Sequence, residues 1–291
     1  ASQSLDVLNA LKYKLDRVTL DKLYKSFIRS KLEYANITWD NCSKYLSDLI
    51  ESVQYRAAKI VSGGISRVSH NAVYSELGWE SLKTRRQHQR LKVFFKAVHD
   101  ECPSYLCDTI PDTNQNERYQ LRNSAKLSEF QCRTQSHQNS FFPLTTKQWN
   151  ELPDLVKDSQ TVHSFMSSLK DDIKKPPSWF NTGKRYYNSI HARLRMLCSP
   201  LNDHLFSFIH VKDSPTCACG HPRETNKHFL LECPLFAIER ARMLTDLYAL
   251  NFEPTVTNLL YGDKSLSSKT NSDAVLIIHR YLIDSSRFDS S

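Results

Sequence analysis

The sequence predicts a mainly α-helical protein that ends in a small helical domain built around cysteine and histidine residues. Three observations indicate this fold class. Apolar residues recur at intervals of three and four over several long segments, which is the period of an amphipathic helix. The 291 residues include only six glycines, and a fold rich in tight hairpin turns would usually need more. Three of the eight cysteines lie close together, within residues 217–233.

Amphipathic helices are expected to fill the first third of the chain. The leucines of residues 5–15 recur at three- and four-residue steps. Gly63 and Gly64 provide a helix end of the kind that glycine favours. Pro103 would end the last helix of this part, because proline cannot continue a helix interior. The helices expected here cover residues 5–35 with a fresh start at Thr19, 45–61, 69–77 and 81–99.

The helical period fades over residues 111–145, where Asn, Gln, Ser and Thr dominate. We expect an ordered connector there with one short strand, because so long a structureless loop is unusual in a compact domain. Pro176-Pro177-Ser178 is the best boundary candidate. The later helices are expected at residues 145–150, 161–174, 185–197, 201–208, 235–250 and 271–285.

These features divide the chain into three consecutive parts. Residues 1–110 would form a helical domain, and residues 111–175 a connector with short helices. Residues 176–291 would form a C-terminal helical domain that contains the cysteine–histidine cluster at 217–233.

The composition is that of a globular protein with a basic surplus. Hydrophobic residues make up 40% and charged residues 24%, and the formal net charge is +8. Such a surplus is compatible with binding to nucleic acid or to an acidic membrane surface. No apolar run approaches the roughly 18 residues of a membrane-spanning helix, and no secretion signal is visible. We therefore expect an intracellular protein, nuclear or cytoplasmic, with reduced or metal-bound cysteines and no membrane partner.

The sharpest local feature is the pattern C-x-C-x8-H-x4-C, formed by Cys217, Cys219, His228 and Cys233. Zinc takes four thiolate or imidazole donors at the corners of a tetrahedron. Two cysteines one residue apart can both face a metal if the chain kinks beside them, and Gly220 provides that freedom. The pattern predicts a closed, structural zinc site, since four protein ligands leave no position for water.

Other interpretations of the cluster remain open at this point. The three cysteines can be unrelated buried thiols beside a surface histidine. A Cys217–Cys219 disulfide would be geometrically strained. His221 is a rival nitrogen ligand, and His228 is preferred because its spacing to Cys233 repeats the H-x4-C half of nucleic-acid knuckles.

Two basic stretches are candidate phosphate contacts, the first in the helix expected at 81–99 and the second beside the cluster. Lysine and arginine neutralise phosphates, and the neighbouring tyrosines of the second stretch can stack on bases. The alternative is a solvated helix face in each case. The candidate residues are Lys83, Arg85, Arg86, Arg90, Lys184, Arg185, Arg193 and Arg195.

The chain offers no convincing catalytic constellation. A polymerase needs paired aspartates on a strand hairpin to hold Mg²⁺. The only adjacent pair, Asp171-Asp172, lies in the helical pattern of residues 161–174 and is expected on its solvent side. Phosphate-binding loops, nucleophile elbows and zinc-protease motifs are also absent from the sequence.

Several stretches together resemble the region that follows the polymerase palm in jockey-like and related non-LTR (LINE) retrotransposon reverse transcriptases. The similarity covers nearly the whole chain and keeps order and spacing. Its main stretches are TLDKLYKSFIRSKLEYANITWD (19–40), LIESVQYRAAKIVSGG (49–64), LGWESLKTRR (77–86), RYQLRN (118–123), SFFPLTTKQWNELP (140–153), HARLRMLCSPLN (191–202) and CACGHPRETNKHFLLECP (217–234).

The resemblance implies a role for each part. Residues 1–110 would correspond to a thumb-like helical bundle that holds the template–primer duplex. The CCHC-type zinc knuckle would help to bind RNA or target DNA. The palm of such an RNA-directed DNA polymerase and its endonuclease have no counterpart in this sequence, so an upstream polymerase domain is an implied partner if the chain is a fragment.

Two functional hypotheses follow. In the first, the chain is the nucleic-acid-binding C-terminal part of a reverse transcriptase, and its partner is RNA or DNA. In the second, it is a degenerate retroelement-derived fragment that acts as a zinc-containing scaffold for protein interactions. A stand-alone enzyme would need a metal-binding carboxylate pair that the sequence lacks.

Overall fold

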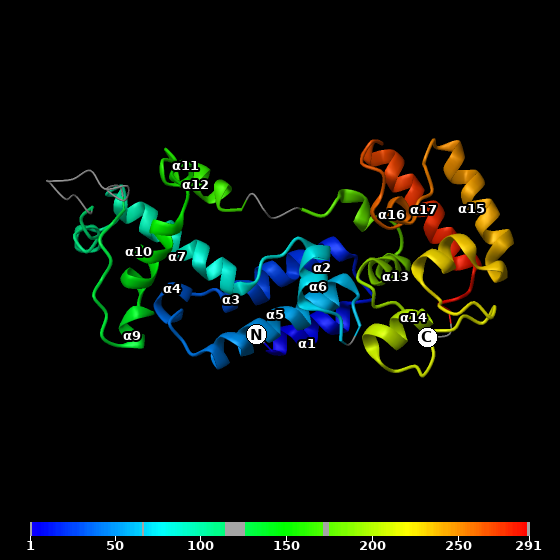
Figure 1. Ribbon diagram of the computed structural model, residues 1–291, viewed down its shortest axis with the longest axis horizontal. Helices are drawn as coiled ribbons and strands as arrows, with labels where there is room; N and C mark the ends of the chain where they lie inside the picture. Colours follow the sequence, from blue (N-terminus) through cyan, green and yellow to red (C-terminus); the bar gives the residue numbers. More distant parts are fainter. Residues whose placement is uncertain (1, 66, 114–125, 171–174, 290–291) are drawn as a thin grey trace. The chain divides into compact units, whose positions relative to one another are not determined.

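The computed structural model describes residues 2–65, 67–113, 126–170 and 175–289 (Figure 1). Helices dominate these residues, which confirms the mainly α fold class. Among them no strand forms, and the only pairing of extended chain is an isolated antiparallel bridge between Thr113 and Leu127. The short strand expected in the connector is therefore not seen in the described part of 111–145, because one bridge does not make a ladder.

Contacts between Cα atoms group the chain into two compact units that are discontinuous in sequence. Unit 1 contains residues 1–31, 52–79 and 175–291, and unit 2 contains residues 32–51 and 80–174. The two units are groups of residues in contact, whereas the three consecutive parts expected from the sequence are segments that would fold as separate domains. That division stays a prediction.

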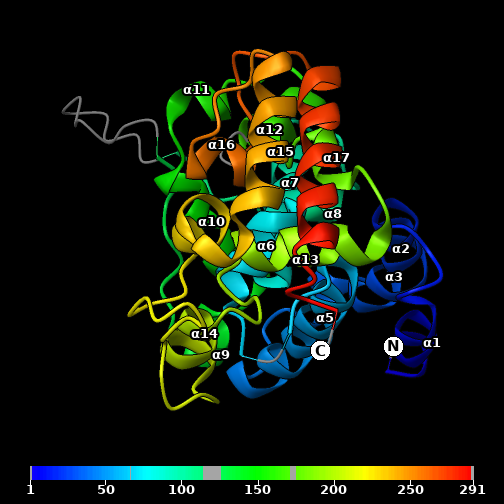
Figure 2. The ribbon, with the colours of Figure 1, turned by 90° about the vertical axis from the view of Figure 1, so that its right-hand side faces the viewer.

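The helices of unit 1 come from both ends of the chain. The N-terminal ones are α1 (Ser2–Leu11), α2 (Arg17–Leu23), the π-helical turn Tyr24–Arg29 and α6 (His70–Leu77). The C-terminal ones are α13 (Arg185–Arg195), α14 (Asn202–His204), α15 (Ala237–Ala249), α16 (Val256–Tyr261) and α17 (Ser268–Asp284). The longest two, α15 and α17, lie side by side (Figures 1 and 2).

Unit 2 is organised around one long helix. Its elements are α4 (Asn36–Trp39), α7 (Leu82–Val98), α8 (Ser104–Cys107), α9 (Gln135–Gln138), α10 (Phe141–Glu151), α11 (Asp154–Lys157) and α12 (Val162–Ser168). Two further helices, α3 (Ser30–Leu32) and α5 (Lys44–Ser62), cross from one unit into the other along the sequence.

Each unit has an apolar core of its own. In unit 1, side chains from α13, α15, α16 and α17 surround Phe229 and Leu230, both fully buried. In unit 2, Phe94 and Phe95 of α7 pack against Trp149 of α10 and Phe165 of α12. Aromatic burial of this kind supplies much of the stability of a helical core.

Local sequence signals set several helix ends where they were expected. The carboxylate of Asp16 accepts the Thr19 amide at 2.9 Å and starts α2 at Arg17, so the fresh start lies two residues before Thr19. Ser81 caps α7 in the same way, through the amide of Thr84. Gly63 ends α5 in a left-handed conformation, with φ of +81°.

Other elements differ from the expectations. The helix expected at 145–150 begins at Phe141, and residues 202–209 form one short α-helix followed by a π-helical turn. Helix α16 was not expected, because six residues are too few for a clear helical period. Asp171-Asp172 and the whole 118–123 stretch of the resemblance lie outside the described residues.

Across the described residues, no helix combines the length and the apolar character that crossing a bilayer requires.

Candidate metal centre

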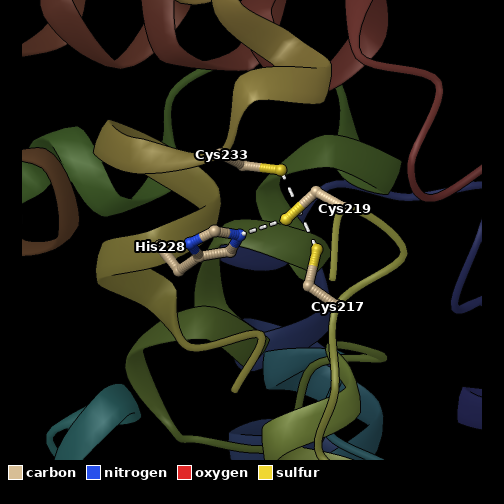
Figure 3. Close-up of side chains that lie close together, drawn as sticks. All are labelled: Cys217, Cys219, His228 and Cys233. Atoms are coloured by element: carbon tan, nitrogen blue, oxygen red, sulfur yellow. Dashed lines mark hydrogen bonds between the residues drawn. The ribbon is translucent and has the colours of Figure 1, made fainter. Parts of the chain in front are cut away.

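The four residues of the C-x-C-x8-H-x4-C pattern converge in unit 1, and their side chains point toward one another (Figure 3). Cys217 and Cys219 lie on a tight turn that the Gly220 amide closes by donating to the Cys217 carbonyl at 2.9 Å. Gly220 has a φ of +89°, which side-chain-bearing residues rarely adopt. The expectation that this glycine allows the kink is confirmed.

The other two residues flank one turn of π-helix. His228 opens the segment His228–Glu232, and Cys233 follows it. The Cys233 amide donates to the His228 carbonyl at 2.7 Å, five residues back, so the turn is wider than an α-helical one. This spacing turns the H-x4-C pair toward the same point.

The distances suit a tetrahedral metal site. The Sγ atoms of Cys217 and Cys233 are 3.8 Å apart, and Cys219 Sγ is 3.2 Å from His228 Nε2. All four donor atoms lie within 4.8 Å of one another. Donors bonded to one zinc ion at about 2.0–2.3 Å lie roughly 3.5–3.8 Å apart at tetrahedral angles. The cluster can therefore hold a metal ion with little rearrangement.

No disulfide competes with this arrangement. All eight cysteines are free, and the 3.8 Å between Cys217 and Cys233 is far longer than an S–S bond of about 2.05 Å. The interpretation of three unrelated thiols does not fit the convergence of their sulfur atoms on the ring of His228.

His221, the rival nitrogen ligand, lies outside the four-donor group. Its ring stacks on that of His228, with centroids 4.1 Å apart and planes at 15°. It can join His228 and Glu232 in a second arrangement of metal-ligand types. The second arrangement uses two exposed groups, whereas the four-donor group includes three buried ones, so the latter is the better-built site.

The core of unit 1 holds the cluster in place. Phe229 and Leu230, next to His228 in the chain, are fully buried. The Tyr281 hydroxyl of α17 donates to the Phe229 carbonyl at 2.5 Å, and Arg240 of α15 donates to the Cys233 carbonyl at 2.6 Å. The ligands therefore lie on backbone that the packing of α15 and α17 already fixes.

A partly buried ion pair fixes the loop between the two halves of the cluster. Glu224 is buried and accepts two hydrogen bonds from Arg287, both at 2.7 Å. It also accepts the Asn202 amide at 2.7 Å, and its own amide donates to the Pro215 carbonyl at 2.8 Å. These bonds join the end of the chain to the loop that carries the ligands.

The structure shifts the pKa values of the cluster residues in different directions. Burial raises the pKa of Cys217 to about 12 and also raises the pKa of Cys233. The amide of His221 donates to Cys219 and lowers the pKa of that thiol. Burial lowers the pKa of His228, which favours the neutral imidazole that a metal needs. A bound cation would stabilise the thiolates that burial alone disfavours.

Glu232 is a residue that the sequence analysis did not single out. Its carboxylate lies 4.0 Å from His228 Nδ1, on the side of the ring opposite the sulfur atoms. A carboxylate on the far nitrogen is a common way to orient a ligating histidine. The sequence signal that could have identified Glu232 is its position four residues after His228.

No protein-family model, curated protein or solved structure matches this chain. The resemblance to LINE reverse transcriptases therefore stays a prediction, and the chemistry of the site rests on the geometry alone.

The candidate phosphate contacts of α7 are mostly engaged within unit 2. Arg85 pairs with Glu33 and with Glu80, the latter at 3.2 Å. The side chain of Lys83 is exposed. On this helix, Lys83 is the candidate that the geometry leaves on the surface.

Arg86 and Arg90 share one carboxylate. Both pair with Asp40 beside α4, and Arg86 also lies over the Trp39 ring with its guanidinium carbon 5.5 Å from the centroid. Arg86 is 3% exposed and Arg90 8%, so both are buried. Their contacts within unit 2 account for these arginines without a ligand.

The candidates at the start of α13 and along it also include both an exposed lysine and arginines that bind other parts of the chain. Lys184 is exposed. Arg185 donates to the carbonyls of Lys12 and Ile60, at 3.1 and 2.7 Å, and Arg193 donates to the Gly63 carbonyl at 2.7 Å. These arginines bind the C-terminal ends of α1 and α5, where carbonyl groups lack helical partners.

Arg195 belongs to a buried network in unit 1. It forms two hydrogen bonds to the Glu76 carboxylate, at 2.7 and 2.9 Å, and Arg17 binds the same carboxylate at 2.6 Å. Its guanidinium also lies 3.9 Å from the centroid of the Phe180 ring. The role of Arg195 as a phosphate contact stays a prediction, and its position in this structure is that of a buried ion-pair residue.

Proposed function

We propose that this chain binds nucleic acid as the C-terminal part of a retrotransposon reverse transcriptase, and that a structural zinc ion stabilises its last domain. The observation that carries the proposal is the convergence of Cys217, Cys219, His228 and Cys233 within 4.8 Å. Three thiolates and one imidazole are a donor set typical of structural zinc.

Zinc suits the cluster better than a hard cation. Magnesium and calcium prefer oxygen ligands, whereas thiolate and imidazole donors select zinc among abundant cellular metals. The ion would be held by side chains from the turn at 217–220 and from the π-helical turn after it. With four protein ligands it would have no open position, so its contribution would be to folding and not to catalysis.

Nucleic-acid binding is supported by the net charge of +8, by the knuckle-like spacing of the cluster and by the resemblance described above. The exposed candidates Lys83 and Lys184 are available for phosphate contact. Under this proposal the protein acts in the nucleus or the cytoplasm, where such elements act.

The test combines metal content with salt-dependent binding. Protein purified with zinc should contain one ion per chain and should bind labelled RNA or duplex DNA, with affinity falling as salt rises. The expected slope of log affinity against log salt is roughly −0.7 to −0.9 per phosphate neutralised. Binding that does not change with salt would contradict phosphate contact.

One observation favours a second function, a zinc-containing scaffold for protein interactions. Arg85, Arg86, Arg90 and Arg195 form ion pairs within the chain, so fewer cations face solvent than the sequence suggested. Under this alternative the zinc-loaded protein would fold and would not bind nucleic acid even at low salt.

A further inference from the structure

Several cations that form no ion pair in the described part of the chain line a cavity of about 480 Å³ in unit 1. It lies between α1, the C-terminal end of α5 and α13, and it is separate from the cysteine–histidine cluster. Four basic side chains line it, against one carboxylate, that of Asp6. The basic residues are Lys12, Arg56, Lys59 and Arg193.

These cations differ from those of α7 in their partners. Among the residues that the structure describes, none of the four forms an ion pair with a carboxylate, whereas Arg85, Arg86 and Arg90 all do. Like charges that line one cavity repel one another, so the arrangement costs free energy unless an anion occupies it. The unpaired charges therefore indicate an anionic ligand.

The fold holds one of these cations, Arg193, in place. The Nε atom of Arg193 donates to the Gly63 carbonyl at 2.7 Å, which holds its guanidinium at the wall of the cavity. Gly63 approaches α13 so closely that a Cβ atom there would lie 2.5 Å from the Ser189 Cβ. The wall formed by α5 and α13 is therefore rigid, as a preformed binding site requires.

A further arginine adds to the positive field beside the cavity. Arg185 donates to the Lys12 carbonyl, yet its Nη1 atom is buried without a hydrogen-bond partner. Burial, together with the cations of Arg17 and Arg193, lowers the pKa of Arg185 to about 10. An anion in the cavity would relieve this repulsion.

An aromatic ring completes the site. Tyr13 lines the cavity, and 67% of its surface is exposed. The Lys12 ammonium lies over this ring, 5.0 Å from its centroid. An exposed aromatic ring beside unpaired cations is the combination by which proteins hold single-stranded nucleic acid, with a base on the ring and phosphates on the cations.

We propose that this cavity binds single-stranded nucleic acid, with phosphates on Lys12, Arg56, Lys59 and Arg193 and a base stacked on Tyr13. The inference rests on the proposed function and names where the polyanion binds. Lys12, Arg56 and Lys59 lie outside the two basic stretches of the sequence analysis, whereas Arg193 belongs to the second of them.

The experiment measures the binding of a labelled RNA single strand of about 20 nucleotides by the zinc-loaded full chain, over a range of salt. The triple variant Lys12→Gln/Arg56→Gln/Lys59→Gln removes three side-chain charges and keeps Arg193, which also binds the backbone. Its matched control, Lys212→Gln/Lys264→Gln/Lys269→Gln, removes three exposed charges elsewhere in unit 1.

The cavity variant should lower the magnitude of the salt slope by about 2, since each lost phosphate contact on a single strand contributes about 0.7. The control should change the slope far less. Tyr13→Ala should weaken binding at least about fivefold, while Tyr13→Phe, which keeps the ring, should retain it. A DNA duplex, whose bases are already stacked, should compete less well than the unlabelled single strand.

The outcomes separate the two proposals. If the wild-type chain binds RNA and the cavity variant binds with the same slope as the control, the cavity inference is wrong and the proposed function stands. If the duplex competes equally and Tyr13→Ala has no effect, the assignment to single strands is wrong. If the wild-type chain binds neither probe at low salt, both proposals fall. Thermal unfolding of each variant checks that the fold is retained.

Discussion

At the scale of single residues, the cysteine–histidine cluster has the clearest chemistry in the described chain. Three sulfur atoms and one ring nitrogen meet, although burial disfavours the charged form of two of the thiols. A metal ion would offset this cost, because it stabilises thiolates directly. The stability of the segment around the cluster should therefore depend on the metal.

Replacing Cys219 by serine should unfold the segment 215–250 locally. Serine is a poor zinc ligand, and structural zinc sites supply apparent binding energies of about 10–16 kcal/mol in small fingers. Hydrogen exchange should show lost protection across 215–250 and unchanged protection in α7 and α10. The control Cys42→Ser lies outside the cluster and should leave both regions protected. Equal protection of 215–250 in both variants would count against a structural metal.

Glu76 is the second residue on which unit 1 depends. It is 5% exposed, and it pairs with Arg17 and Arg195. Burial raises the pKa of its carboxyl, but the two guanidinium groups outweigh that effect and leave the pKa lowered. The residue is therefore ionised in the folded protein.

The substitution Glu76→Gln should lower the free energy of unfolding by about 3–5 kcal/mol, because it leaves two buried cations without a counter-charge. Denaturant unfolding measures the change. Glu253→Gln, at an exposed site in the same unit, should alter stability by less than about 0.5 kcal/mol. A loss of similar size in both variants would show that the network contributes little.

At the scale of elements, the junction between α5 and α13 joins segments that are more than a hundred residues apart in sequence. Arg185 and Arg193 of α13 donate to the carbonyls of Ile60 and Gly63 at the end of α5. Gly63 allows this contact because it has no Cβ and adopts a positive φ. The sequence predicted a helix end at this glycine, but the partner helix became evident only in the structure.

Adjacent glycines provide a matched test of that junction. Gly63→Ala should destabilise unit 1 by about 1–3 kcal/mol, because alanine is strained at φ of +81° and its Cβ would clash with Ser189. Gly64→Ala should cost less, because Gly64 has no positive φ and the nearest atom to its Cβ is the Ser62 hydroxyl oxygen, at 3.3 Å. Thermal or denaturant unfolding compares the stability of the two variants. Equal unfolding midpoints would contradict the close approach of Gly63 to Ser189.

The helices that were predicted best are the long amphipathic ones. Helices α5, α7 and α13 each repeat apolar residues over about three turns or more, so periodicity alone identified them. Helix α16 is one and a half turns long, and its signal was Thr255, which caps it through the Asn258 amide at 3.1 Å. Short helices of this kind are stabilised by burial of residues such as Leu259, and sequence periodicity does not reveal them.

At the scale of the molecule, buried histidines make stability depend on pH. Burial, with a smaller effect of the Arg195 cation, lowers the pKa of His279 from 6.5 to about 4. Burial likewise lowers the pKa of His204 to about 4. Because the unfolded chain takes up these protons first, stability is fully present above pH 6.5 and is lost as pH falls toward 4.

The variant His279→Leu should make this dependence shallower. Each such histidine contributes up to about 1.4 kcal/mol per pH unit between the two pKa values, so the variant should lose about that much slope. Free energies of unfolding measured from pH 7 to pH 4 test this, at constant zinc so that metal release affects both proteins alike. Parallel curves for the two proteins would contradict a neutral, buried His279.

The sequence by itself determined the helical class, most long helices and the four residues of the cluster, because periodicity and ligand spacing are local properties of the chain. It did not determine which basic side chains lack a carboxylate partner. Arg86, Arg90 and Arg195 pair with carboxylates that lie 40 or more residues away, or on other helices, while Lys12 and Arg56 line a cavity without such partners. Only the tertiary structure decides this, because an ion pair depends on distance in space, and packing brings together residues that the sequence separates.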